Sequence, residues 1–315
     1  MGEDGTGKPL TFLQSMGQRL AAEKLRAQER LKTYGRDEWN FAIVGLDCDL
    51  TTFNLEGLAL FRAVVEPPGE IFLAGALENS TAFGAIGRYS SQIKHELAVS
   101  RTFAGDDSQA IWNLAWWLIS GLRVKTLAEF LVPVTANCSW SVIAAIDDHT
   151  CKAKLLEDVP QTQSLTESVK VVEEDFRWAL RKALIMGELL EVPRFRLAVE
   201  ALTTHQHLLS PRMMAASIWS GIEALMDISQ ELTFRLALSV ASLLEPRGEQ
   251  RYERYRQTKK LYEVRSRAVH GGELNDAAIR QHVIQSRKLL SDLICHMLDA
   301  RKVLSREDIE RTVLG

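Results

Sequence analysis

Cysteine is scarce and scattered in this 315-residue sequence. The four cysteines are Cys48, Cys138, Cys151 and Cys295, and they form no CxxC pair. A disulfide framework or a structural zinc site would need clustered spacing, so this pattern disfavours both. Free thiols persist in a reducing compartment, and we therefore expect a cytoplasmic protein without a bound metal.

The sequence also lacks a long uninterrupted apolar run. Its most apolar stretch, residues 110–134, contains Arg123, Lys125 and Glu129 and therefore predicts a buried helix instead of a membrane span. The N-terminus is acidic and polar, unlike a signal peptide. We expect a protein that does not associate with membranes.

A phosphate-binding loop is nearly present at the start of the chain. Residues 2–8 match GxxxxGK, but Pro9 replaces the hydroxyl residue that would bind magnesium, and no strand precedes the loop. We therefore expect no nucleotide cofactor here, and we assign residues 1–36 to a tail and an amphipathic helix with apolar residues from Leu13 to Tyr34.

An excess of basic residues is absent as well. The chain has 38 Lys and Arg against 41 Asp and Glu, a net charge of −3, which disfavours a protein that coats nucleic acid over its whole surface. The charge is unevenly distributed, however. Residues 247–267 hold eight basic and three acidic residues, a net charge of +5, so the remainder of the chain carries −8.

The hydrophobic pattern predicts an α+β protein with two domains after the N-terminal helix. In residues 37–158, short apolar runs at 41–46, 58–65 and 139–146 predict strands, and the tryptophan-rich run from 112 to about 130 predicts a helix. This mixed α/β region is our candidate sensor or regulatory domain. Pro160 and the polar residues around it mark its end.

Residues 159–315 predict an all-helical bundle. Capping residues, prolines and apolar spacing give helices with brief connections between them. The expected helices cover residues 164–191, 210–227, 230–244, 249–270 and 275–304, a further helix starts at Pro193, and a short last helix follows Ser305.

The helix expected at 249–270 combines basic and aromatic side chains. Guanidinium and ammonium groups interleaved with tyrosines suit a phosphate backbone with stackable bases, although a solvated helix face with surface ion pairs would look the same. The candidate RNA-binding residues are Arg254, Tyr255, Arg256, Lys259, Lys260 and Tyr262.

This helix ends in an RxxxxH motif formed by Arg265 and His270. The surrounding residues resemble the motif helix of the HEPN superfamily, and in particular its ApeA-like branch, Leu-Tyr-x-x-Arg-Ser-x-x-Val-His-Gly. The matching residues are Leu261, Tyr262, Arg265, Ser266, Val269, His270 and Gly271. The segment from Ile218 to Met226, which contains Glu223, is similar to an earlier helix of the family. The resemblance covers about residues 164–304.

The resemblance implies a helical bundle of the HEPN type and a metal-independent endoribonuclease, a hydrolase-class toxin or effector of bacterial antiviral defence. It implies a homodimer in which Arg265 and His270 of both protomers form one cleft. An imidazole can accept the proton of the ribose 2′-hydroxyl, and a guanidinium can stabilise the charged phosphorane. Ser266, Arg267 and Glu223 are candidate supporting residues, and RNA is the expected partner, together with a regulatory protein or antitoxin.

The spacing of the motif favours a paired site. Residues five apart on a helix point about 140° apart, so Arg265 and His270 do not share one face of a regular helix. Gly271 and Gly272 would let the helix end at His270, and two such ends that face each other would complete a site.

Two other functions remain open at this point. Ser266 stands where many HEPN nucleases have Asn, Asp or His, which favours a non-catalytic HEPN module that dimerises, binds RNA or a nucleotide and signals to a partner protein. In a structural helical scaffold, Arg265 and His270 would instead be ordinary surface residues, and Glu223 would be a packing partner for an arginine.

Overall fold

The structure is a computed structural model of mixed α and β content, as the sequence predicts. It describes residues 12–34, 38–78, 83–100, 107–159, 165, 167–228, 232–269 and 273–314. Its contacts divide the chain into one unit of residues 1–111 and 130–158 and a second unit of residues 112–129 and 159–315. The inclusion of 112–129 in the second unit does not follow from the sequence.

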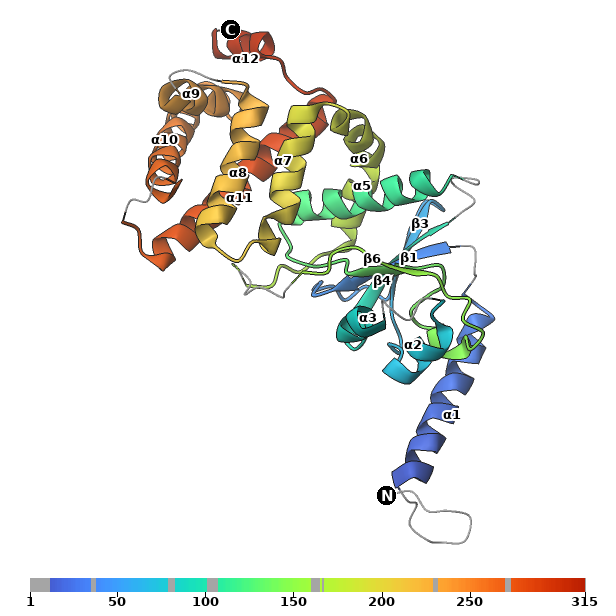
Figure 1. Ribbon diagram of the computed structural model, residues 1–315. Helices are drawn as coiled ribbons and strands as arrows, with labels where there is room; N and C mark the ends of the chain where they lie inside the picture. The colour runs from blue at the N-terminus through green and yellow to red at the C-terminus, as the bar shows by residue number, and fades with distance from the viewer. Residues whose placement is uncertain are drawn as a thin grey trace. The chain divides into compact units, whose positions relative to one another are not determined.

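The first unit is built on an antiparallel sheet with the order β2-β3-β4-β1-β5-β6 in the part of the chain that the structure describes (Figure 1). The strands are β1 (Glu38–Val44), β2 (Thr52–Leu55), β3 (Ala59–Ala63), β4 (Ile93–Ser100), β5 (Val134–Ala136) and β6 (Ala153–Leu155). Along β1, six of the seven residues are buried, because β4 and β5 cover its two edges. The strands predicted at 41–46 and 58–65 are confirmed by β1 and β3.

Three α-helices of the first unit are α1 (Phe12–Leu31), α2 (Glu70–Ala76) and α3 (Phe83–Ser90). The predicted amphipathic helix is confirmed by α1, in which Ala27 is fully buried. Arg26 and Arg30 both donate to the carboxylate of Glu66, and this pairing lowers the pKa of Glu66. These ion pairs fasten the C-terminal half of α1 to the turn that follows β3.

The strand predicted at 139–146 is wrong. The segment forms a turn followed by a 3₁₀ helix, η2 (Ile143–Ala145), although Trp140 and Ile143 are fully buried. The cause is the buried carboxylate of Glu96 on β4, which accepts hydrogen bonds from the Trp140 amide at 2.7 Å and from Ser139 Oγ at 2.5 Å. The Glu96 carboxylate therefore accepts from a buried backbone amide that would otherwise have needed a partner on a neighbouring strand.

Two of the scattered cysteines meet in space. Cys138 follows β5 and Cys151 precedes β6, and the pairing of these strands brings the two buried sulfur atoms to 3.1 Å. The two cysteines are not joined by a disulfide, and their proximity could not be predicted from their sequence spacing.

The second unit consists of helices in the residues that the structure describes (Figure 1). They are the part of α5 (Ser108–Thr126) from residue 112 onward, α6 (Glu173–Leu190), α7 (Pro193–Thr204), the 3₁₀ helix η3 (His205–His207), α8 (Pro211–Met226), α9 (Leu232–Leu244), α10 (Glu249–Val269), α11 (Asp276–Ala300) and α12 (Arg306–Leu314).

Most of the predicted helix starts are confirmed. Pro193 and Pro211 occupy the first turns of α7 and α8, and the Asn275 side chain caps α11 by accepting from the Ala278 amide at 2.8 Å. The start predicted at Ser164 is wrong, because α6 begins at Glu173. There the Val172 amide donates to Asp175 at 3.0 Å, and three acidic residues in the first turn favour the helix N-terminus.

The core of the second unit is centred on α8, which contacts α7, α10 and α11. Gly221 of α8 allows close approach, since a Cβ atom there would lie 3.1 Å from Ala198 Cα on α7. A tighter case is Gly187 on α6, where a Cβ atom would lie 2.5 Å from Cζ2 of Trp117 on α5. The indole of Trp117 therefore occupies the space that a side chain at 187 would need.

We predict that Gly187→Ala destabilises the protein by about 1–3 kcal/mol, because the added methyl group must displace the Trp117 ring. The measurement is chemical denaturation followed by the helical circular dichroism signal. Gly84→Ala is the control, because a Cβ atom at Gly84 in α3 would meet nothing within 4 Å. Equal stability of the Gly187→Ala variant and the wild type would contradict this account of α5–α6 packing.

Candidate functional site

The motif arginine lies in the last two turns of α10 and faces α8. Arg265 Nη2 donates to Glu223 Oε2 at 3.3 Å and lies 3.1 Å from Glu223 Oε1. The two side chains are 18% and 24% exposed, so the ion pair is largely shielded from water. Two of the residues singled out in the sequence, on different helices, are thus brought into direct contact.

Glu223 engages only part of the guanidinium. Arg265 Nε is buried and has no hydrogen-bond partner among the described residues. The guanidinium carbon lies 5.6 Å from the centre of the Tyr262 ring, one turn earlier on α10. Burial, together with the negative charge of Glu223, raises the pKa of the Tyr262 phenol.

Of the other residues singled out near the end of α10, the structure describes only some. His270, Gly271 and Gly272 lie outside the described residues. Ser266 is half-buried, and Arg267 is exposed. Behind them, the carbonyl of Ala268 accepts a hydrogen bond from Arg212 Nη1 at 2.8 Å, which gives one of the last carbonyls of α10 a partner on α8.

Tyr262 does not face a ligand, contrary to its selection as an RNA-binding residue. It is 8% exposed, and its ring meets the fully buried ring of Trp219 edge-on at a centroid distance of 5.4 Å. A base therefore cannot stack on Tyr262, which is a core residue. The alternation of tyrosines and basic residues along α10 concealed this, because a helix turns successive side chains to different faces.

The remaining candidate RNA-binding residues do not form one cluster. Arg254 pairs with Glu245 at 3.0 Å, and Arg256 lies 3.8 Å from Glu253. Lys259 and Lys260 are exposed. Tyr255 is half-buried and packs edge-on against Phe234 of α9 at 6.1 Å.

Trp219 of α8 connects α10, the helix that carries the motif, to α11. Its indole Nε1 donates to His282 Nε2 and to Ser286 Oγ, both at 3.0 Å. The His282 and Trp219 rings are also stacked, with centroids 6.0 Å apart. Because an indole can only donate, His282 Nε2 must accept, and the neutral ring then carries its proton on Nδ1.

The His282 proton has no acceptor in the described residues. Nδ1 is buried and unpartnered, and the side chain is 2% exposed. Burial lowers the pKa of His282 to about 4, so the ring is neutral near neutral pH. Thr258 on α10 is 1% exposed, and its Oγ1 is likewise buried without a partner among the described residues.

Both residues line a groove of about 790 Å³ between α10 and α11. Four cationic residues line it, and no Asp or Glu does so among the described residues. The cations are Arg254, Lys260 and Arg267 of α10 and Lys288 of α11. The amides of Gln257, Gln281 and Gln285 supply further polar groups. We call this feature the α10–α11 groove.

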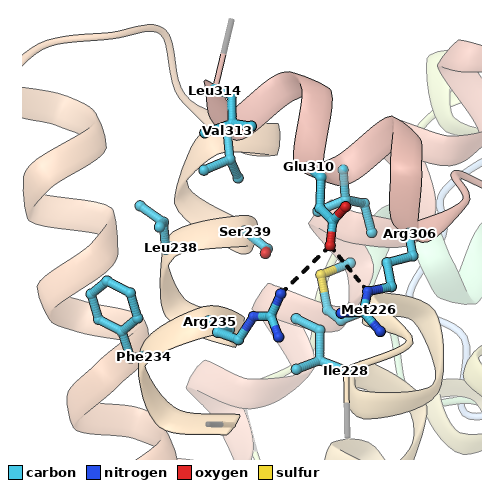
Figure 2. Close-up of a pocket in the computed structure, with 11 residues that line it drawn as sticks. Met226, Ile228, Phe234, Arg235, Leu238, Ser239, Arg306, Glu310, Val313 and Leu314 are labelled. Carbon is cyan, nitrogen blue, oxygen red and sulfur yellow. Dashed lines mark hydrogen bonds and ion pairs between the residues drawn. The ribbon is translucent and has the colours of Figure 1, made fainter. Parts of the chain in front are cut away.

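A second pocket, of about 630 Å³, lies between α9 and α12 (Figure 2). Its wall is mostly apolar, and its one described carboxylate pairs with two arginines. Glu310 of α12 accepts from Arg306 at 3.0 Å and lies 3.5 Å from Arg235 of α9, as the dashed lines in Figure 2 show. Both arginines therefore have a carboxylate partner inside the pocket, whereas no described carboxylate lines the α10–α11 groove.

No protein-family model, curated protein or solved structure matches the chain. Within the described ranges, no helix is both long and apolar enough to cross a membrane, and no three His, Cys, Asp or Glu side chains gather as metal ligands would.

The contribution of α11 was missed in the sequence. Four residues of α11 line the groove together with α10 only because the two helices are in contact in the fold: Gln281, His282, Gln285 and Lys288. The available signal was the 3.6-residue spacing of the polar positions 281, 285 and 288, which places them on one face of α11.

We predict that Arg265 and Glu223 are energetically coupled. Arg265→Ala and Glu223→Ala each leave a shielded charge without its partner, so each should destabilise the protein, and the double variant should be more stable than the sum of the two effects implies. A double-mutant cycle from denaturant unfolding should give a coupling of about 0.5–3 kcal/mol. The pair Arg256 and Glu253, exposed on the same helix, is the control and should couple by less than about 1 kcal/mol. Coupling of Arg265 and Glu223 no larger than in the control pair would contradict the ion pair.

We predict that His282 makes the protein less stable in acid. Its folded pKa of about 4 lies below its ordinary value of 6.5, so the unfolded chain binds a proton first as the pH falls. Stability attributable to His282 is therefore present above pH 6.5 and lost between pH 6.5 and 4, by roughly 3 kcal/mol at most. A glutamine can accept from Trp219 without titrating, so His282→Gln should show a shallower decline than the wild type in this range. Unfolding free energies from pH 7 to 4 measure this, and parallel curves would exclude it.

Proposed function

We propose that the chain is a metal-independent endoribonuclease of the HEPN type, with Arg265 and His270 as its catalytic residues. The observation that carries the proposal is the setting of the RxxxxH motif. Arg265 is held by Glu223 at the end of the most basic helix, and the α10–α11 groove beside it is lined by four cations and no described carboxylate. In this proposal the enzyme works as a homodimer in bacterial antiviral defence, and the first unit senses a trigger or binds a regulatory partner.

The proposed reaction needs no water and no metal. The 2′-oxygen of a ribose bonds to the adjacent phosphorus, and the bond from phosphorus to the 5′-oxygen breaks. An imidazole of His270 takes the proton of the 2′-hydroxyl, and a protonated imidazole, supplied by the partner protomer, gives a proton to the leaving 5′-oxygen. The products are a 2′,3′-cyclic phosphate and a 5′-hydroxyl.

The proposed role of Arg265 follows from charge. The pentacoordinate phosphorane carries more negative charge than the phosphodiester, and a guanidinium placed against it stabilises the transition state more than the ground state. Glu223 would act as a positioning residue, since its carboxylate fixes Nη2 of Arg265 while Nε has no acceptor in the described chain.

We predict that His270→Ala lowers the rate of RNA cleavage in EDTA by about 10²-fold or more, because general acid–base catalysis contributes about 10²–10⁴-fold. Arg265→Ala should also be nearly inactive. Arg311→Ala, which removes an exposed arginine of α12 that pairs with Glu307, is the control and should cleave at about the wild-type rate. The assay uses the full chain and end-labelled single-stranded RNA, with DNA of the same sequence as a substrate that lacks the 2′-hydroxyl.

Equal cleavage by the wild type and both motif variants, or a requirement for magnesium, would contradict the proposal. Thermal unfolding of each variant shows whether lost activity reflects lost structure, which matters for Arg265 because it has a buried partner. The products should carry a 2′,3′-cyclic phosphate, as detected by mass spectrometry.

One observation favours a second candidate function, a non-catalytic HEPN module that dimerises, binds RNA or a nucleotide and signals to a partner protein. The Arg265 side chain is only 18% exposed and already paired with Glu223, as a purely structural arginine would be. This function predicts RNA binding without cyclic-phosphate product at high protein concentration, whereas the nuclease predicts product under the same conditions.

A further inference from the structure

We propose that the α10–α11 groove is the track along which a single strand of RNA binds, separate from the site that contains Arg265. This inference rests on the proposed function for the identity of the ligand as RNA. Its observations are independent of the motif, because Arg265 is not among the residues that line the groove. The track differs from the surface predicted from the sequence, since it excludes Arg256, Lys259 and both tyrosines and includes Arg267 and the polar residues of α11.

The charge of the groove favours an anion. Lys260 and Arg267 have no carboxylate partner among the described residues, and the partners of Arg254 and Lys288, Glu245 and Asp292, do not line the groove. Both Lys260 and Arg267 are exposed and can follow a ligand. Cationic side chains that line a concave surface without acidic side chains in its wall create a concentrated positive potential, which attracts a phosphate.

The spacing of the cations favours a strand over a compact anion. Arg254 and Arg267 are thirteen residues apart on α10, which at 1.5 Å per residue is about 20 Å along the helix. No single phosphate reaches both ends. A stacked strand advances about 3.4 Å per phosphate, so about four to six nucleotides fill the groove, a footprint typical of single-strand sites.

The groove wall also holds polar atoms that lack partners. His282 Nδ1 carries a proton, as its bond from Trp219 requires, and Thr258 is a second polar residue that lines the groove, on α10. Both Nδ1 of His282 and Oγ1 of Thr258 are buried without a partner among the described residues, although buried donors in folded proteins are nearly always satisfied. The three glutamine amides of the groove can bond to ribose and base edges.

The other candidate sites lack such features. In the α9–α12 pocket, Arg235 and Arg306 both pair with Glu310, which itself lines the pocket (Figure 2). In the first unit, the buried Glu96 is saturated by Arg62, Ser139 and the Trp140 amide. The α10–α11 groove thus combines uncompensated charge with unpartnered buried polar atoms.

The test measures binding of the full chain to a fluorescent RNA of about eight nucleotides whose 2′-hydroxyls are all methylated, so that it cannot be cleaved. The groove variant Lys260→Ala/Arg267→Ala is compared with Arg256→Ala/Lys259→Ala. Both remove one arginine and one lysine from α10, but only the first pair lines the groove. We expect the groove variant to bind about tenfold more weakly or worse. Its plot of log K against log salt concentration should be shallower by about 1.4, since each phosphate contact to a single strand contributes about 0.7.

The outcomes separate this inference from the proposed function. Equal losses in the groove and control variants, equal affinity for duplex and single-stranded RNA, or displacement of the RNA by stoichiometric inorganic tripolyphosphate would each overturn the track. If the wild type cleaves RNA and the groove variant binds and cleaves RNA like the wild type, the proposed RNA track is contradicted and the proposed nuclease activity is supported. If Arg265→Ala and His270→Ala cleave like the wild type while the groove variant loses RNA binding, the proposed nuclease site is contradicted and the proposed RNA track is supported. Circular dichroism melting of both double variants shows that each is folded.

Discussion

The indole of Trp219 holds together the three helices from which both sites are built. It lies fully buried on α8, meets Tyr262 of α10 edge-on, and donates through its single N–H to His282 and Ser286 of α11. The distance between α10 and α11 at the groove, the orientation of Arg265 one turn beyond Tyr262, and the tautomer of His282 all depend on this contact. The N–H group of the indole is as important as the apolar surface that the ring buries, because an indole N–H left unpaired in the core would cost about 1–3 kcal/mol.

Much of the helical unit could be predicted from sequence because its signals are local. Proline in the first turn, an asparagine or serine cap and 3.6-residue spacing act within one or two turns, and they located α7, α8, α11 and α12. The first unit was less predictable. Residues 139–146 have the apolar character of a buried strand, yet the carboxylate of Glu96, more than forty residues earlier, determines their conformation. A side chain distant in sequence overrode the local preference.

The same distinction applies to the candidate site. Glu223 and Arg265 were both singled out from the motif and meet in an ion pair, a contact that suits a supporting residue and a packing partner alike, and the surplus of charge in α10 was visible as composition. What could not be predicted was which face of α10 each residue occupies, because that depends on where α8 and α11 pack. Tyr262 therefore became a core residue, and Arg267 and Lys288 became opposite walls of one groove. His270, the residue on which the chemistry of the proposal depends most, lies outside the described residues.

The path of the chain between the two units bears on how the protein is made. Residues 112–129 belong to the second unit, but residues 130–158 return to the first. Glu129 pairs with Arg287 and Val124 accepts from Ser291, so these partners emerge from the ribosome some 160 residues after the helix that needs them. Until then, the apolar face of α5 lacks the helices of the second unit against which it packs in the folded protein. An excised fragment that began at residue 159 would lack one wall of its core, so the helical half is not an autonomous module that can be cut out at the boundary.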